Sequence, residues 1–136
     1  MIYVMGSLRH DRPGEVARQL REAGFDVFDD WRATHPNTDD EWRDYEISRG
    51  RGFIEALAAP AAQNVFQFDK ANLDRADTGV LVCPAGRSAH LELGYMLGGG
   101  KRGYILLDDP DRWDVMYNFA TGVVSTVDDL LFELSF

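Results

Sequence analysis

Residues 80–101, with the sequence VLVCPAGRSAHLELGYMLGGGK, constrain the fold more than any other part of this chain. The run 79–83 is short, apolar and rich in β-branched residues, which predicts a buried strand. A turn at 84–86 follows, and 89–97 has a helix-forming composition, with Ser88 as the expected N-cap and three glycines as the stop. A strand, a tight turn and a helix in this order are typical of a parallel α/β sheet. In such sheets the functional residues lie at the carboxyl ends of the strands.

The rest of the chain repeats this alternation of short apolar runs and helical patterns. Strands are expected at 1–5, 25–28, 79–83, 102–107 and 122–124, and helices at 12–23, 61–76, 89–97, 113–119 and 126–134. The order predicts one domain over 1–136, a three-layer, doubly wound parallel sheet of about five strands with the flavodoxin-like order 2-1-3-4-5. In this order the carboxyl ends of the first and third strands face one crevice.

The segment at about 29–64 is inserted after the second strand and is strongly acidic, yet aromatic residues interrupt it. Thr38 to Glu41 has the form of a capping box, which predicts a helix that starts near Asp39. A second helical piece is expected at 53–58. Two interpretations of the insert stay open: a solvated structural face, or a lid whose aromatic residues cover a pocket, with Trp31 and His35 as further members.

Composition excludes several classes of function. The formal net charge of −9 argues against a partner that is a nucleic-acid polymer. The single cysteine, Cys83, excludes a disulfide framework and favours a reducing compartment. No apolar stretch approaches the ~20 residues of a membrane span. We therefore expect a soluble cytoplasmic protein that does not enter a membrane. The histidines show no metal-ligand spacing, and no cofactor is expected.

Glu92 is the one acid in the otherwise apolar helix at 89–97. Its place near the helix N-terminus predicts that the carboxylate stays ionised and is available as a nucleophile near neutral pH. Acids are also common in first helical turns, where they only complement the helix dipole from a solvated face. Position alone leaves both interpretations open.

The stretch GRSAHLELGYMLGGGK resembles the helix motif of the nucleoside 2-deoxyribosyltransferase superfamily, which includes deoxynucleoside 5′-monophosphate N-glycosidases and CMP hydrolases. The resemblance implies that Glu92 is the nucleophile that attacks the anomeric carbon of the sugar. The pattern D-x-x-x-L-x-x-A-D before the third strand is similar to the same superfamily. It implies that Asp69 acts on the base or leaving group, whereas Asp77 is structural. Without the resemblance, Asp69 would be a solvated acid paired with Lys70 or Arg75.

The first strand and its turn, IYVMGSLR, resemble the G-S-I-R-type loop that holds the 5′-phosphate in the deoxynucleotide N-glycosidases. The resemblance implies ligand contacts from Gly6, Ser7 and Arg9. It also makes Tyr3 a candidate pocket residue, with core packing as the alternative. A further group of candidate phosphate contacts, Gly86, Arg87 and Ser88, follows from the rule that helix N-termini bind anions.

These motifs predict hydrolysis of the N-glycosidic bond of a (deoxy)nucleoside 5′-monophosphate through a glycosyl ester on the glutamate. Three alternatives stay open: deoxyribosyl transfer between bases, hydrolysis of NAD, and a nucleotide-binding or sensing module without turnover. In each case the partner is a small nucleotide or nucleoside. The resemblance also implies a homodimer or a higher homo-oligomer. The apolar residues of 113–119, and Leu131 and Phe132 of the closing helix, are the expected interface.

Overall fold

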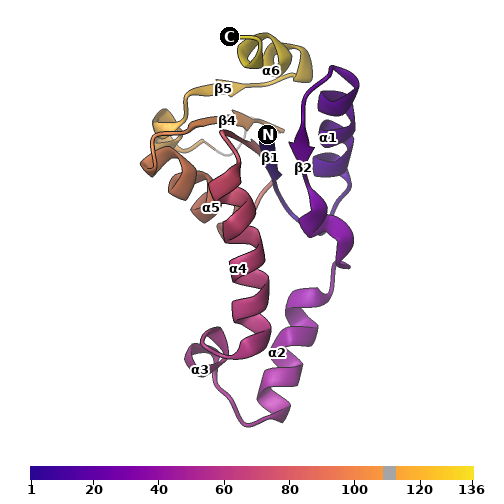
Figure 1. Ribbon diagram of the computed structural model, residues 1–136, viewed down its shortest axis with the longest axis vertical. Coiled ribbons are helices and arrows are strands. Elements are labelled where there is room, and N and C mark those ends of the chain that lie inside the picture. The colour runs from indigo at the N-terminus through magenta and orange to yellow at the C-terminus, as the bar shows by residue number, and fades with distance from the viewer. Residues whose placement is uncertain (109–112) are drawn as a thin grey trace.

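The computed structural model describes residues 1–108 and 113–136, and these form one parallel five-stranded sheet with helices on both faces (Figure 1). The strand order is β2-β1-β3-β4-β5, and every adjacent pair is parallel. The predicted flavodoxin-like topology is confirmed. Among the described residues, no helix combines the length and the apolar character needed to cross a membrane.

The strands and helices fall close to their predicted places. The strands are β1 (Ile2–Met5), β2 (Val27–Phe28), β3 (Thr78–Val82), β4 (Arg102–Leu106) and β5 (Gly122–Val124). The α-helices are α1 (Arg12–Glu22), α2 (Thr38–Ser48), α3 (Phe53–Leu57), α4 (Pro60–Arg75), α5 (Arg87–Gly98) and α6 (Val127–Leu134), and two 3₁₀ helices are η1 (Asp30–Ala33) and η2 (Val115–Phe119).

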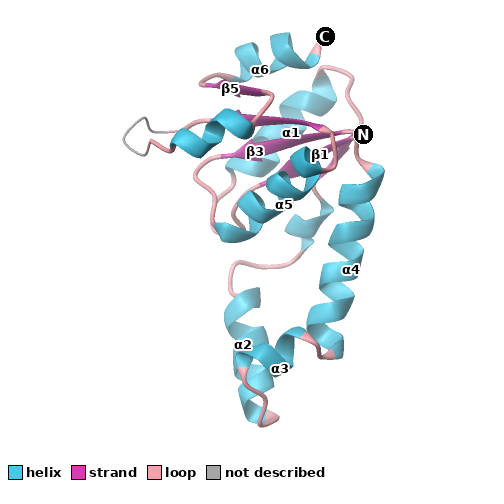
Figure 2. Ribbon diagram, turned by 90° about the vertical axis from the view of Figure 1, so that its left-hand side faces the viewer, coloured by secondary structure: helices cyan, strands magenta, loops and turns pink. Residues whose placement is uncertain are grey.

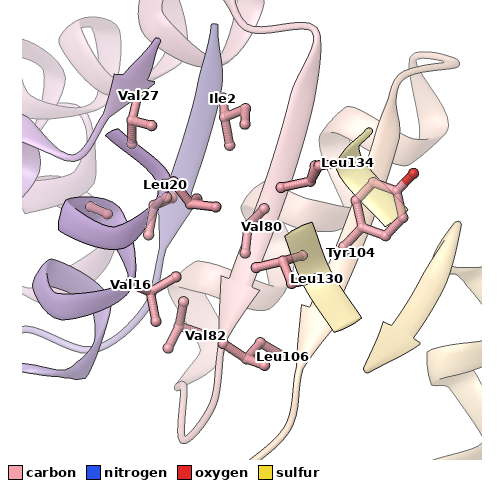
Figure 3. Close-up of a cluster of buried hydrophobic side chains, with 12 residues drawn as sticks. Ile2, Val16, Leu20, Val27, Val80, Val82, Tyr104, Leu106, Leu130 and Leu134 are labelled. Carbon is pink, nitrogen blue, oxygen red and sulfur yellow. The ribbon is translucent and has the colours of Figure 1, made fainter. Parts of the chain in front are cut away.

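Each face of the sheet carries its own apolar core, because successive side chains of a strand point to opposite faces. Ile2 and Val4 of β1 belong to the core shared with α1 and α6 (Figure 3). Tyr3 and Met5 point to the other face, where α5 and the last turns of α4 cover them. β1 and β3 are buried on both faces, which explains why their sequences are apolar runs instead of alternating ones.

The insert forms most of a helical arm, which we define as α2, α3 and residues 60–68 of α4. In Figures 1 and 2 the arm extends away from the sheet, and α4 runs from α3 back to the sheet. The second half of α4 packs against the sheet through Leu73 and Ala76. One continuous helix therefore joins the arm to the core of the domain.

Three local predictions are wrong in detail. Gly86, not Ser88, is the N-cap of α5, so that Ser88 lies inside the first turn. Thr38 is the first residue of α2, whose N-cap is Asn37, and the Thr38 hydroxyl donates to the carbonyl of His35 instead of forming a capping box. The helix expected at 113–119 is a shorter 3₁₀ helix, η2. The predicted Thr126 cap of α6 is confirmed by its hydrogen bond from Asp129 N.

Two glycines should respond oppositely to substitution by alanine. A Cβ on Gly103 would lie 2.6 Å from Leu93 Cδ1 and 2.9 Å from Leu97 Cδ2, because β4 and α5 pack closely there. We expect Gly103→Ala to lower the free energy of unfolding by about 1–3 kcal/mol. Gly94, inside α5, has open space around its Cα. Gly94→Ala should therefore stabilise by about 0.5–1 kcal/mol. Urea unfolding of both variants measures this, and equal effects would contradict the packing described.

Candidate active site

Glu92 and Tyr3 form the centre of the candidate site. The Tyr3 hydroxyl donates to Glu92 Oε2 across 2.8 Å, joining β1 to α5 over a separation of 89 residues. Tyr3 is fully buried in the core below α5. The hydrogen bond from Tyr3 holds the Glu92 carboxylate in one orientation. A carboxylate on a solvated helix face would have no such partner. Tyr3 is thus a core residue whose hydroxyl contacts Glu92, and its role in a ligand pocket stays a prediction.

The expectation that the helix N-terminus keeps Glu92 ionised is wrong. Because α5 begins at Arg87, Glu92 lies beyond the first turn, where the helix dipole has little effect. Burial raises the pKa of Glu92 to about 7, with a smaller contribution from the charge of Asp69, while the hydrogen bond from Tyr3 acts in the opposite direction. Glu92 is therefore a partly buried acid that titrates at neutral pH.

Asp69 of α4 lies close enough for its charge to raise the pKa values of both Glu92 and Tyr3. Its own pKa is raised by burial. Lys70, a suggested ion-pair partner, instead bonds Asp74 at 2.9 Å, and Arg75 contacts Met1 Sδ. Asp77 pairs with the amino terminus at the start of β1, as expected for a structural residue. Two carboxyl groups with raised pKa values in one place are a pattern typical of active sites.

Two aromatic residues that the sequence analysis missed extend from this centre towards the arm. The Phe28 ring lies 5.0 Å from the Tyr3 ring, and the Phe68 ring lies 6.0 Å from the Phe28 ring, centroid to centroid. Phe68 is half exposed and directly precedes Asp69. The sequence contained a clue to Phe28, because this residue ends the second strand at the sheet edge where the predicted ligand-binding loops lie.

The loop after β1 carries three of the predicted ligand contacts. Gly6 is required by packing, since a Cβ there would lie 2.7 Å from Pro13 Cγ and 3.2 Å from the carbonyl oxygen of Val82. Ser7 Oγ accepts a hydrogen bond from the backbone N–H of Arg9, at 3.0 Å, and a hydroxyl that accepts can still donate its proton. The Arg9 side chain is exposed. The loop thus has a fixed turn and an exposed guanidinium.

The other predicted phosphate contacts lie at the start of α5, and β1 and β3 are neighbours in the sheet. Gly86, Arg87 and Ser88 are exposed, and the N-cap makes no side-chain bond to the first turn. The N-cap of α1, Asp11, makes none either. The N-terminus of α5, which has no acidic residue in its first turn, therefore favours an anion, whereas Asp11 and Glu15 place carboxylates at the start of α1.

Arg12, His10 and His90 hold these loops in place, and the sequence analysis missed all three roles. The guanidinium of Arg12 bonds the carbonyl of Cys83, and also that of Leu107 at 2.8 Å, which ties the ends of β3 and β4 to α1. His10 Nε2 lies 3.0 Å from the Pro84 carbonyl oxygen. His90 bridges the Gly86 carbonyl, at 2.7 Å, and the Tyr117 hydroxyl of η2, at 2.9 Å. These hydrogen bonds join residues that are far apart in the sequence, so no local sequence pattern predicts them.

The aromatic residues of the insert do not all form a lid, because several of them make structural contacts. Trp31 is partly buried, and its Nε1 donates to the Val4 carbonyl at 2.6 Å, so that it fastens the insert to β1. His35 lies 2.9 Å from Glu41 at the start of α2. Trp42 and Phe53 pack on each other within the arm, with ring centroids 6.2 Å apart.

A cavity of about 650 Å³ lies between α5 and η2. Its walls include His90, Leu97, Ile105 and Tyr117, whereas Tyr3, Asp69 and Glu92 do not line it. The Cys83 thiol is buried near Tyr117, and this burial raises its pKa, which disfavours a reactive thiolate. The cavity is therefore separate from the pair of carboxyl groups.

No protein-family model matches this chain, and no curated protein matches it significantly. The geometry of Tyr3, Asp69 and Glu92 is therefore the basis for assigning a function.

Glu92→Gln should stabilise the protein at alkaline pH but not at acidic pH. Between its ordinary value of 4.5 and about 7, the folded state retains a proton on Glu92 that the unfolded state has released. The wild type therefore loses stability as pH rises through this window. Glutamine is neutral and can still accept the hydrogen bond from Tyr3. We therefore expect the substitution to raise the free energy of unfolding by about 1–3 kcal/mol at pH 8 and hardly at all at pH 4.

Denaturant unfolding at both pH values measures the difference. The exposed Glu55→Gln is the control and should change stability little at either pH. A Glu92→Gln variant no more stable than the wild type at pH 8 would show that Glu92 does not carry a buried charge.

Proposed function

We propose that the protein hydrolyses the N-glycosidic bond of a (deoxy)nucleoside 5′-monophosphate, with Glu92 as the nucleophile. The observation that supports this most is the hydrogen bond from Tyr3 to the partly buried Glu92 carboxylate, next to a second carboxyl group, Asp69. A paired nucleophile and acid are what a retaining glycosidase uses. The sequence resemblance to nucleoside 2-deoxyribosyltransferases gives the same assignment.

In the first step, a Glu92 oxygen attacks the anomeric carbon, C1′, while the bond from C1′ to the base nitrogen breaks. The electron pair of that bond leaves with the base, and Asp69 gives the base a proton. The product is a glycosyl ester on Glu92. Tyr3 holds the carboxylate in place through Oε2, which fixes the direction of the attacking oxygen.

In the second step, water attacks C1′ and gives a proton to Asp69, which is thereby restored. The ester bond breaks, its electron pair returns to the Glu92 carboxylate, and the sugar 5-phosphate leaves. If a second base attacked in place of water, the same residues would perform deoxyribosyl transfer. The acceptor alone separates the two reactions.

The scheme requires a particular protonation state of the two carboxyl groups. Each group has a raised pKa, and the charge of Asp69 raises that of Glu92. These directions leave the proton of a singly protonated pair mainly on Glu92. Attack by Glu92 therefore requires the less populated arrangement, in which the proton lies on Asp69 and the charge on Glu92.

The 5′-phosphate would bind at the ends of β1 and β3. The exposed Arg9 and Arg87 supply guanidinium groups, whose planar forks match phosphate oxygens, and Ser7 and Ser88 supply hydroxyls. The backbone N–H groups at the start of α5 add further donors. An anion fits here despite the acidity of the whole chain, because these loops carry local positive groups.

The test is release of free base from a panel of nucleoside 5′-monophosphates, the matching nucleosides, and NAD, resolved by chromatography. We expect release from at least one 5′-monophosphate, with a lower rate for its nucleoside, because the nucleoside lacks the phosphate contacts. Glu92→Gln should lower kcat by about a thousandfold or more, since a covalent nucleophile is lost. The control is Glu133→Gln, a partly exposed glutamate of α6, which should keep wild-type turnover.

Each alternative has its own outcome. Near wild-type turnover by folded Glu92→Gln would disprove the mechanism. Tight binding of nucleotides without release would make the protein a binding module, and release of nicotinamide from NAD alone would make it an NAD glycohydrolase. Equal rates for nucleotides and nucleosides would remove the phosphate site.

A further inference from the structure

Phe68 is the outermost member of a row of aromatic rings that begins at the candidate active site. The Tyr3 hydroxyl bonds Glu92, and the Tyr3 ring lies 5.0 Å from the Phe28 ring, centroid to centroid. The Phe68 ring in turn lies 6.0 Å from the Phe28 ring. Tyr3 and Phe28 are buried, whereas 53% of Phe68 is exposed. One end of the row is therefore fixed in the core, and the other end presents a partly open aromatic ring.

An exposed aromatic residue is ordinary by itself, but the position of Phe68 next to Asp69 is not. The charge of Asp69 raises the pKa values of Tyr3 and Glu92, so its carboxyl group lies close to both. Phe68 reaches the same part of the sheet through its contact with Phe28. Two consecutive side chains of α4, a flat ring and a carboxyl group, therefore lie on the side of the helix that faces the candidate active site.

The angle between these two side chains suits a flat ligand. Successive residues of an α-helix are about 100° apart around the helix axis. A base that stacks face to face on the Phe68 ring can therefore meet the Asp69 carboxyl group at its edge. The lone pairs of the nitrogen atoms of a base lie in the plane of its ring, so a proton donor has to approach from the edge. The two neighbours thus offer a surface for the face of a base and an acid for its edge.

We propose that Phe68 stacks on the base of the substrate and sets the preference for the kind of base through the area of this stacking contact. The proposal rests on the proposed function and adds a specificity-determining residue to it. Stacking on an aromatic side chain needs only a flat π face, which every base has, and contributes about tenfold to a hundredfold in affinity for each base. The two fused rings of a purine cover more of a phenyl ring than the single ring of a pyrimidine does. Purine nucleotides should therefore gain more from Phe68 than pyrimidine nucleotides.

Substitutions at position 68 test the role of the flat ring. Phe68→Leu keeps an apolar side chain against Phe28 but has no π face. We expect it to lower kcat/KM for purine 5′-monophosphates by about tenfold or more, and that for pyrimidine 5′-monophosphates by less. Phe68→Tyr keeps the flat ring and should retain the wild-type ratio of the two. The matched control is Phe66→Ala, because Phe66 is 55% exposed on the same helix but about 200° around its axis from Phe68, and its substitution should leave both values unchanged.

Binding is measured separately from turnover, by titration calorimetry of purine and pyrimidine 5′-monophosphates into Glu92→Gln. The same titrations into Glu92→Gln combined with Phe68→Leu should give an affinity for the purine nucleotide that is about tenfold lower. Circular dichroism checks that each variant keeps its helix content. If Phe68→Leu does not fold, nuclear Overhauser contacts between the base protons of a saturating purine nucleotide and the Phe68 ring in Glu92→Gln decide, and their absence would overturn the proposal.

The outcomes separate this proposal from the proposed function. Base release by the wild type, with an unchanged ratio of purine to pyrimidine kcat/KM in folded Phe68→Leu, would overturn the role of Phe68 and leave the hydrolysis standing. Purine binding that weakens in the double variant, in a protein that releases no base, would support the stacking and overturn the hydrolysis. A loss in Phe66→Ala as large as that in Phe68→Leu would also overturn the proposal, because the effect would then not depend on which side of α4 is changed.

Discussion

The parallel pairing of β1 with β3 is the constraint on which the rest of the structure depends. Met5 pairs with Leu81, so that the two strands end together although 76 positions separate them in the chain. This adjacency brings the loop after β1 next to the N-terminus of α5, and it places Tyr3 beneath Glu92. Without it, neither the hydrogen bond between them nor the paired helix N-termini would exist. The chemistry proposed for this chain is therefore a consequence of strand order.

Burial of Glu92 connects stability with function. The side chain occupies an apolar helix that packs on the sheet, and burial makes its charged form costly. Selection for stability alone would favour a neutral residue at this position. An acid kept there at a cost, oriented by a buried tyrosine and accompanied by Asp69, is typical of a site maintained for its reactivity.

The sequence predicted the sheet well, because buried parallel strands have a strong signal in their continuous apolar runs, and because topology rules limit their order. It also gave Glu92 as a candidate, because an acid stands out in an apolar helix, but position left its role open and only the resemblance implied a nucleophile. It did not predict the raised pKa of Glu92, because the helix begins at Arg87 and burial is a tertiary property. Phe68 and Arg12 were missed for a related reason: their roles depend on distant partners, which no local pattern encodes.

The central claim is that Glu92 becomes covalently linked to the sugar. Acid quenching during turnover of a deoxynucleoside 5′-monophosphate, followed by mass spectrometry of the intact protein and of its peptides, tests this most directly. The account predicts an added deoxyribose 5-phosphate group on the peptide that contains Glu92, present in the wild type and absent in Glu92→Gln. Base release without any adduct, under conditions in which breakdown of the ester limits turnover, or an adduct on another residue, would contradict it.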